Sequence, residues 1–168
     1  TPAAKRFCCK ASLRPDRTKA RWKMACSTST NSFANTYLRS IKMHQQHLLS
    51  AEALAHRIDS TIVIDCRSDL SDPGLGQKQY LEGHIPNAAF FALHDALAGP
   101  KTPGSGRHPL PDPDQLVHRM RMLGTTDDSL VVAYDAGPGV YAARLWWLLR
   151  WCGHESVSVL DGGFAAWL

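Results

Sequence analysis

Three aspartates stand where the chemistry of an α/β protein is usually found. Asp65, Asp135 and Asp161 each end, or directly follow, a short apolar run that predicts a buried strand. Ligand and active sites of open α/β sheets lie at the carboxyl ends of the strands. A carboxylate at that edge can act as a nucleophile. We therefore expect any site of this chain to lie there.

The segment that follows the apolar run at residues 130–134 has the strongest local pattern. It reads D-A-G-P-G-V-Y-A-A-R, so that Asp135 begins a glycine-rich connection into a predicted helix. Backbone amides around Gly137 and Gly139 can converge on an anion there, helped by the positive end of the helix. Arg144 lies in the first turns of that helix, where it can pair with Asp135. We expect Gly137, Gly139 and Arg144 to form the scaffold of the loop.

Taken by itself, this loop is compatible with three interpretations. Gly137, Gly139 and Ala142 match the G-x-G-x-x-A pattern of dinucleotide-binding folds, and Asp161 lies 24 residues beyond the first of these glycines. Asp135 is also a candidate aspartyl nucleophile, although Gly137 replaces the partner acid that usually follows two residues on. In the third interpretation the glycines serve only a tight turn.

The cysteines and histidines show no spacing typical of metal ligands. There are five cysteines, an odd number without a C-x-x-C pair, which argues against a disulfide framework and against a zinc cluster. Cys66 and Cys152 adjoin apolar segments, where a cysteine is most often a small core residue. We therefore expect no metal and no cofactor. The other cysteines are Cys8, Cys9 and Cys26.

Apolar runs alternate with amphipathic segments, and they predict the elements that position these residues. Strands are expected at residues 61–65, 88–91, 130–134 and 157–160, and helices at 77–82, 113–123 and 140–152, with short ones after Ser50 and after residue 163. Ser50 and Asp112 suit the N-cap position, and Pro113 suits the first helical position. Residues 99–114 hold five prolines and predict a loop. The alternation predicts an α/β fold with a central parallel sheet flanked by helices on both faces.

The charge divides the chain into two parts. Residues 1–42 hold ten basic residues and one acid, whereas residues 43–168 hold nine basic and fourteen acidic residues. We expect a basic, disordered tail followed by one domain, whose apolar runs are far shorter than the ~20 residues of a membrane span. The tail is compatible with a targeting segment, with a nucleic-acid-binding arm, or with a non-native extension ahead of a natural start at Met43.

Several segments, in order, resemble the rhodanese (sulfurtransferase) family. They are I-D-C-R at residues 64–67, Y-L-E-G-H-I-P-N-A at 80–88, V-V-A-Y-D at 131–135, G-H-E-S-V at 153–157 and L-D-G-G-F-A-A-W at 160–167. The resemblance covers about residues 48–168. In addition, G-R-H-P-L-P at 106–111 and A-A-R-L-W-W at 142–147 are similar to the amino-terminal half of two-domain thiosulfate and 3-mercaptopyruvate sulfurtransferases.

The resemblance implies a domain without its nucleophile. Catalytic rhodanese domains place a cysteine directly after the V-V-x-Y strand, where it carries sulfane sulfur as a persulfide, whereas this chain has Asp135. We therefore expect the amino-terminal domain of a sulfurtransferase, truncated at its carboxyl end and inactive alone. The partners implied are a small anionic sulfur donor, a cyanide or thiol acceptor and a second rhodanese domain of the same protein. The alternative is a non-catalytic rhodanese-like module that binds or regulates a partner.

The resemblance also suggests accessory residues. His84 matches a histidine proposed to assist the transfer together with an aspartate, for which Asp72 is the nearest upstream candidate; the alternative is a histidine that bonds to the loop backbone and fixes the turn. Arg107, next to His108, is expected to meet an anionic substrate or a carboxylate of the second domain, and the alternative is a structural ion pair. We expect neither a nucleic-acid nor a membrane partner. The expected location is cytoplasmic, or mitochondrial if the basic tail is a transit peptide.

Overall fold

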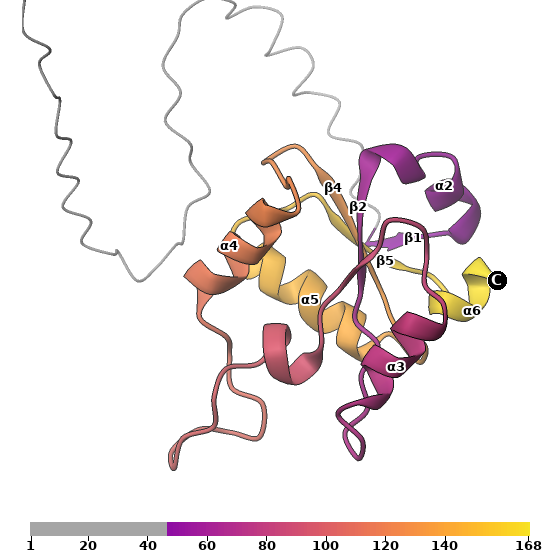
Figure 1. The fold of residues 1–168 in the computed structure, drawn as a ribbon. Helices are drawn as coiled ribbons and strands as arrows, with labels where there is room; N and C mark the ends of the chain where they lie inside the picture. The colour runs from indigo at the N-terminus through magenta and orange to yellow at the C-terminus, as the bar shows by residue number, and fades with distance from the viewer. Residues whose placement is uncertain (1–46) are drawn as a thin grey trace, which may run out of the picture.

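The computed structural model describes residues 47–168, so the predictions for residues 1–42 lie outside the described part of the chain. Its centre is a sheet of five parallel strands in the order β1-β5-β4-β2-β3 (Figure 1). The strands are β1 (Leu48–Leu49), β2 (Thr61–Asp65), β3 (Ala89–Phe90), β4 (Leu130–Tyr134) and β5 (Val157–Leu160). The α/β fold expected from the sequence is confirmed.

Two of the helices begin at the side-chain caps that the sequence predicts. Ser50 accepts a hydrogen bond from the Ala53 N–H, and Asp112 accepts bonds from the N–H groups of Asp114 and Gln115. None of the helices in residues 47–168 has the length and hydropathy that crossing a bilayer requires. The helices are α2 (Ala51–Ala55), the 3₁₀-helix η1 (Ile58–Ser60), α3 (Leu75–Glu82), the π-helix η2 (Leu93–Leu97), α4 (Pro113–Met122), α5 (Val140–Trp151) and α6 (Gly163–Trp167).

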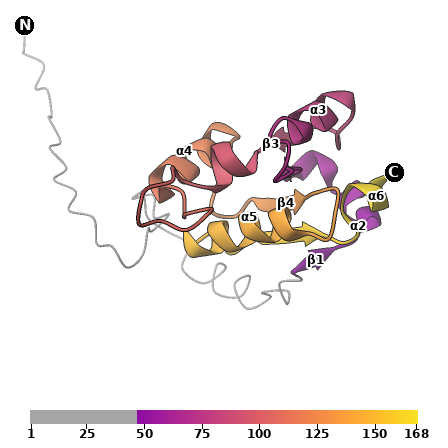
Figure 2. The same ribbon diagram turned by 90° about the horizontal axis from the view of Figure 1, so that it is seen from below.

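Helices lie on both faces of the sheet (Figure 2), and each face has its own apolar core. Alternate residues of a strand point to opposite faces, so in β2 Ile64 packs with α4, α5 and η2, whereas Val63 packs with α2 and α6. In β4, Ala133 and Tyr134 divide in the same way. Helices on both faces leave the carboxyl ends of β2 and β4 side by side, since the register pairs Asp65 with Tyr134.

The differences from the predicted elements are local. The helix expected at residues 77–82 begins two residues earlier, and the strand expected at 88–91 shortens to Ala89–Phe90. β1 and η2 were not predicted. β1 is two residues long and exists through its pairing with β5, while η2 forms because the Ala92 carbonyl accepts from the N–H groups of Ala96 and Leu97. Neither gives a periodic signal in the sequence.

Candidate functional site

The side chain of Asp135 fills the glycine-rich loop that follows β4. Its Oδ1 accepts hydrogen bonds from the N–H groups of Gly137 at 3.0 Å and Gly139 at 3.1 Å. Its Oδ2 accepts from the N–H groups of Tyr141 at 3.0 Å and Ala142 at 3.2 Å. Only 2% of Asp135 is exposed. The loop is therefore an anion cradle, as the sequence suggested, and the anion that it holds belongs to the chain.

Two glycines allow this arrangement. Gly139, with φ of +83°, lets the chain turn into α5 so that the first N–H groups of the helix face the carboxylate. Gly163 lies behind the loop, where a Cβ would collide with the carbonyl oxygen of Asp135. That carbonyl accepts a 2.9 Å bond from the Phe164 N–H. Gly163 of the L-D-G-G segment thus forms the back wall of the loop.

The occupied cradle limits the chemistry of the loop. A dinucleotide pyrophosphate would need the N–H groups that Asp135 already occupies, so the dinucleotide-binding interpretation does not fit this geometry. A nucleophile needs free lone pairs, whereas both carboxylate oxygens of Asp135 each accept two bonds. Beside the loop lies a cavity of about 280 Å³ lined by Pro138, Gly162 and the exposed Asp161, among others.

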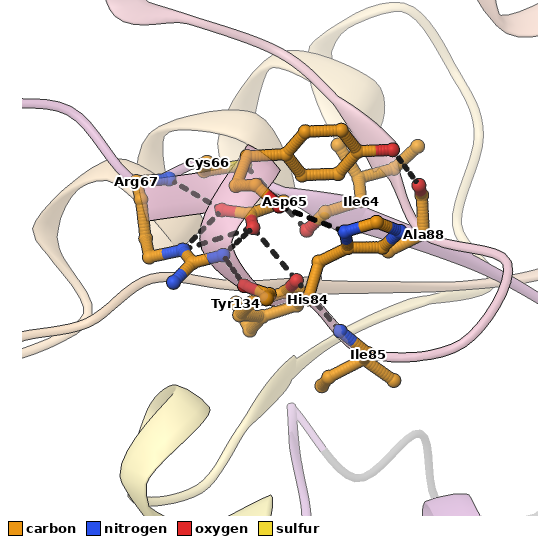
Figure 3. Close-up of polar contacts among 10 residues, drawn as sticks. Ile64, Asp65, Cys66, Arg67, His84, Ile85, Ala88 and Tyr134 are labelled. Atoms are coloured by element: carbon orange, nitrogen blue, oxygen red, sulfur yellow. Dashed lines mark hydrogen bonds and ion pairs between the residues drawn. The ribbon is translucent and has the colours of Figure 1, made fainter. Parts of the chain in front are cut away.

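A second polar cluster lies at the neighbouring end of β2, where Asp65 is fully buried between Arg67 and Tyr134 (Figure 3). Arg67 donates from Nε and Nη2 to the carboxylate at 2.6 to 3.1 Å, and the Tyr134 hydroxyl donates to Oδ2 at 2.7 Å. The guanidinium of Arg67 also stacks over the Phe164 ring at 4.3 Å. Burial and the Asp65 carboxylate raise the pKa of Tyr134, so its hydroxyl stays protonated and donates.

This cluster holds the turn that carries His84. Arg67 Nη2 donates to the Gly83 carbonyl at 2.6 Å, and the Ile85 N–H donates to the Tyr134 hydroxyl at 3.2 Å. His84 itself is exposed, stacks on Tyr80 with ring centroids 4.0 Å apart, and donates from Nδ1 to the Tyr80 carbonyl at 2.8 Å. The residues on both sides of His84 are therefore fixed by a buried ion pair. Asp65 was predicted as a site residue, but its contacts with Arg67 and Tyr134 were not. The D-x-R spacing after the strand indicates the pairing with Arg67 but gives no sign of the contact with Tyr134.

The relay expected between Asp72 and His84 is not formed. Asp72 precedes α3, and its Oδ1 accepts a 3.0 Å bond from the Gly74 N–H. His84 follows the same helix, whose eight residues span about 12 Å. Each side chain bonds to the backbone of its own turn. The structure thus places the two residues at opposite ends of α3, and their accessory roles stay predictions.

Arg144 does not pair with Asp135, which corrects the predicted pairing. Its Nε donates to the Leu97 carbonyl at 2.8 Å, and its Nη2 donates to the carbonyls of His108 and Pro109 at 3.0 and 3.1 Å. It therefore fastens η2 and the proline-rich loop to α5 and does not pair with Asp135. Arg107 is exposed in that loop, directly before His108.

Neither described cysteine is a reactive thiol. Cys66 is fully buried, and its burial together with the nearby charges of Asp65 and Asp135 raises the pKa of its thiol. Burial raises the pKa of Cys152 to about 11. Both remain protonated near neutral pH, where only a thiolate attacks sulfur. In residues 47–168, no three side chains of His, Cys, Asp or Glu gather into a metal site.

Comparison with known proteins agrees with this geometry. The family model described as "Rhodanese-like domain" matches residues 50–168. The chain belongs to this family. As a rhodanese-like domain it is homologous to the amino-terminal half of 3-mercaptopyruvate and thiosulfate sulfurtransferases.

Two curated relatives and one solved structure illustrate the match. A protein of Pseudomonas aeruginosa named "Probable 3-mercaptopyruvate sulfurtransferase" is 48% identical over 129 residues, which is 74% of this chain and 45% of the relative. The 3-mercaptopyruvate sulfurtransferase of Escherichia coli is 37% identical over 123 residues, 71% of this chain and 43% of the relative. The crystal structure of SseA from Escherichia coli superposes with a TM-score of 0.62 at 38% identity, covering 73% of this chain and 47% of that chain. The chain thus spans less than half the length of these relatives.

Proposed function

We propose that this chain serves as the amino-terminal, non-nucleophile domain of a sulfurtransferase. In the reaction proposed, a cysteine thiolate on a second rhodanese domain attacks the outer sulfur of thiosulfate or the sulfur of 3-mercaptopyruvate. With thiosulfate the sulfur–sulfur bond breaks and sulfite leaves. With 3-mercaptopyruvate the carbon–sulfur bond breaks, the carbon takes up a proton, and pyruvate leaves. The cysteine persulfide then passes its outer sulfur to cyanide or a thiol. The names and lengths of the relatives support this assignment.

The observation that carries the proposal is the carboxylate of Asp135 inside the cradle. A carboxylate cannot hold sulfane sulfur, and its charge repels an anionic donor from the loop. The four N–H groups that would otherwise stabilise a thiolate or a persulfide are saturated by the Asp135 oxygens. The loop therefore serves stability, and the nucleophile is assigned to another domain.

The contribution proposed for this domain is a rigid surface at the carboxyl end of its sheet. Asp65, Arg67 and Tyr134 fix the turn of His84, and Arg144 fixes the loop of Arg107. His84 and Arg107 are both exposed, so both are available to a substrate or to a second domain. We propose them as accessory residues that position an anionic substrate, with no chemical step on this domain.

The test is a steady-state assay of the purified chain with either donor and cyanide as acceptor. We expect no thiocyanate above the rate of a buffer blank with either donor. The matched control is Cys66→Ser, because Cys66 is the cysteine next to the cradle. Turnover by the wild-type chain that disappears in Cys66→Ser would assign a nucleophile to this domain and overturn the proposal.

A non-catalytic binding module remains the second candidate, and one observation favours it. Trp147 and Trp151 stack on each other at 5.9 Å on the outside of α5 and are 46% and 42% exposed. Exposed indole pairs are typical of contact surfaces. The discriminating observation is the coding sequence beyond Leu168. A second rhodanese repeat with cysteine after its V-V-x-Y strand supports the enzyme, and a stop codon supports the module.

A further inference from the structure

An unusual pair of histidines lies where the proline-rich loop meets η2. The rings of His94 and His108 are 5.3 Å apart and inclined at 49°. Both ring nitrogens of His108 are shielded from water, and within residues 47–168 neither has a hydrogen-bond partner. A buried polar group without a partner destabilises the fold, and a ligand that supplied the partner would relieve that cost.

The surroundings of His108 are positive. Burial lowers the pKa of His108, and the charges of His94, Lys101, Arg144 and Arg107 lower it further. Lys101 and Arg107 belong to the loop and are exposed, whereas His94 begins η2 and Arg144 reaches the loop from α5. Each element packed against the ring therefore adds positive charge.

No acid of the described residues neutralises this cluster. Arg144 is half-buried, yet its hydrogen bonds all go to backbone carbonyls. Asp95, the acid next to His94, is held by Arg119 through two bonds of 2.7 and 3.0 Å. A half-buried guanidinium without a counter-charge is costly, and an external anion would compensate it. The charge also argues against a metal cation on the two imidazoles.

The proline-rich loop is closed by a backbone hydrogen bond, in which the Gly99 N–H donates to the Pro109 carbonyl at 3.1 Å. Figure 1 shows this loop and the loop that precedes α3 projecting from the same side of the molecule. A ligand bound here would lie outside the Asp135 cradle.

We propose that Lys101, Arg107 and His108 form a binding site for a small oxyanion. The choice of thiosulfate as that oxyanion rests on the function proposed above. Protonated His108 donates an N–H to the anion, and Lys101 and Arg107 supply charge from the rim of the loop. Since the ring nitrogens are shielded, His108 or its loop moves when the anion binds, and the ring signal reports that movement.

The experiment is a titration of the chain with sodium thiosulfate near pH 6.5, an unperturbed histidine pKa, followed through the ¹H–¹³C NMR signals of the His94 and His108 rings. Sodium chloride at matched ionic strength is the control for screening. We expect saturable shifts of both signals with thiosulfate and none with sodium chloride. We also expect the midpoint of the His108 titration to rise by about one pH unit when thiosulfate is bound, since a nearby opposite charge favours the protonated ring.

Two variants make the result specific. The double variant Lys101→Gln/Arg107→Gln is expected to weaken thiosulfate binding by about fivefold or more, since two exposed charges are lost. Lys78→Gln, which removes an exposed charge on α3, is expected to leave it unchanged. Shifts that chloride reproduces, or equal affinity in the double variant, would overturn the site. Those outcomes would also remove the accessory role proposed for Arg107, but they would leave the assignment as a non-nucleophile domain standing, because that assignment rests on Asp135.

Discussion

Asp135→Ala tests the carboxylate-filled cradle most sharply, because it removes the acceptor of four backbone N–H groups at once. Gly137 is exposed and Gly139 is half-buried, so water can replace the carboxylate as the acceptor of their N–H groups. Each of these two replaced hydrogen bonds lowers the free energy of unfolding by about 1 kcal/mol. The N–H of Ala142 is buried and that of Tyr141 is partly so, and each loses about 1 to 3 kcal/mol when left unpaired. Since such terms are not additive, the expected decrease in the free energy of unfolding is about 3 to 5 kcal/mol.

The assay is urea unfolding followed by tryptophan fluorescence and far-ultraviolet circular dichroism, whose coincident transitions establish two-state behaviour. Asp161→Ala is the matched control, because this aspartate follows the next strand of the sheet but is exposed. Its expected change is within about 0.5 kcal/mol. If Asp135→Ala unfolds at every condition, Asp135→Asn keeps one carbonyl acceptor and should lose less. Equal stability of Asp135→Ala and Asp161→Ala would refute the reasoning.

Four further predictions follow from the same contacts. Arg67→Ala leaves the Asp65 carboxylate buried without its cation and is expected to lower the free energy of unfolding by about 3 to 5 kcal/mol in urea titrations; a loss below about 1 kcal/mol would contradict the buried pair. The Cys66 thiol, whose pKa is raised mainly by burial, should resist iodoacetamide at about pH 8 until urea unfolds the chain, as read by mass spectrometry. Burial lowers the pKa of His154, so between about pH 7 and pH 5 the unfolded state binds a proton that the folded state does not. The free energy of unfolding should therefore fall over this range, and it should fall less steeply in His154→Gln. The pair Trp147→Ser/Trp151→Ser should abolish concentration-dependent association in analytical ultracentrifugation, and a wild-type chain that stays monomeric at high concentration would contradict the exposed patch.

Features that depend on neighbours in sequence could be predicted. The β-branched runs of β2 and β4 mark buried strands. Ser50 caps α2 and Asp112 caps α4, as expected. The place of Asp135 at the start of a glycine-rich loop also followed from local order. The amides of such a loop and of a helix start must face the same point, so the cradle was predictable without coordinates.

Features that depend on long-range contacts could not be predicted. Arg144 and the carbonyls that it binds are separated by 35 to 47 residues, and Tyr134 and Asp65 by 69. Nothing in the local pattern distinguishes a carbonyl across the fold from the nearby Asp135 as a partner for Arg144. β1 depends on a strand more than a hundred residues away, with which it pairs Leu48 to Val159. Tertiary packing sets these contacts, and single-sequence patterns do not record it.

The central claim is that this domain carries no sulfur in turnover, and mass spectrometry of its cysteine-containing peptides after incubation with thiosulfate and with 3-mercaptopyruvate tests that claim most directly. Asp135 occupies the cradle, and the thiols of Cys66 and Cys152, the two cysteines of residues 47–168, are buried and protonated. We predict no added sulfur on the peptides that contain these two cysteines, with either donor. A gain of one sulfur atom on either peptide that cyanide removes would contradict the claim.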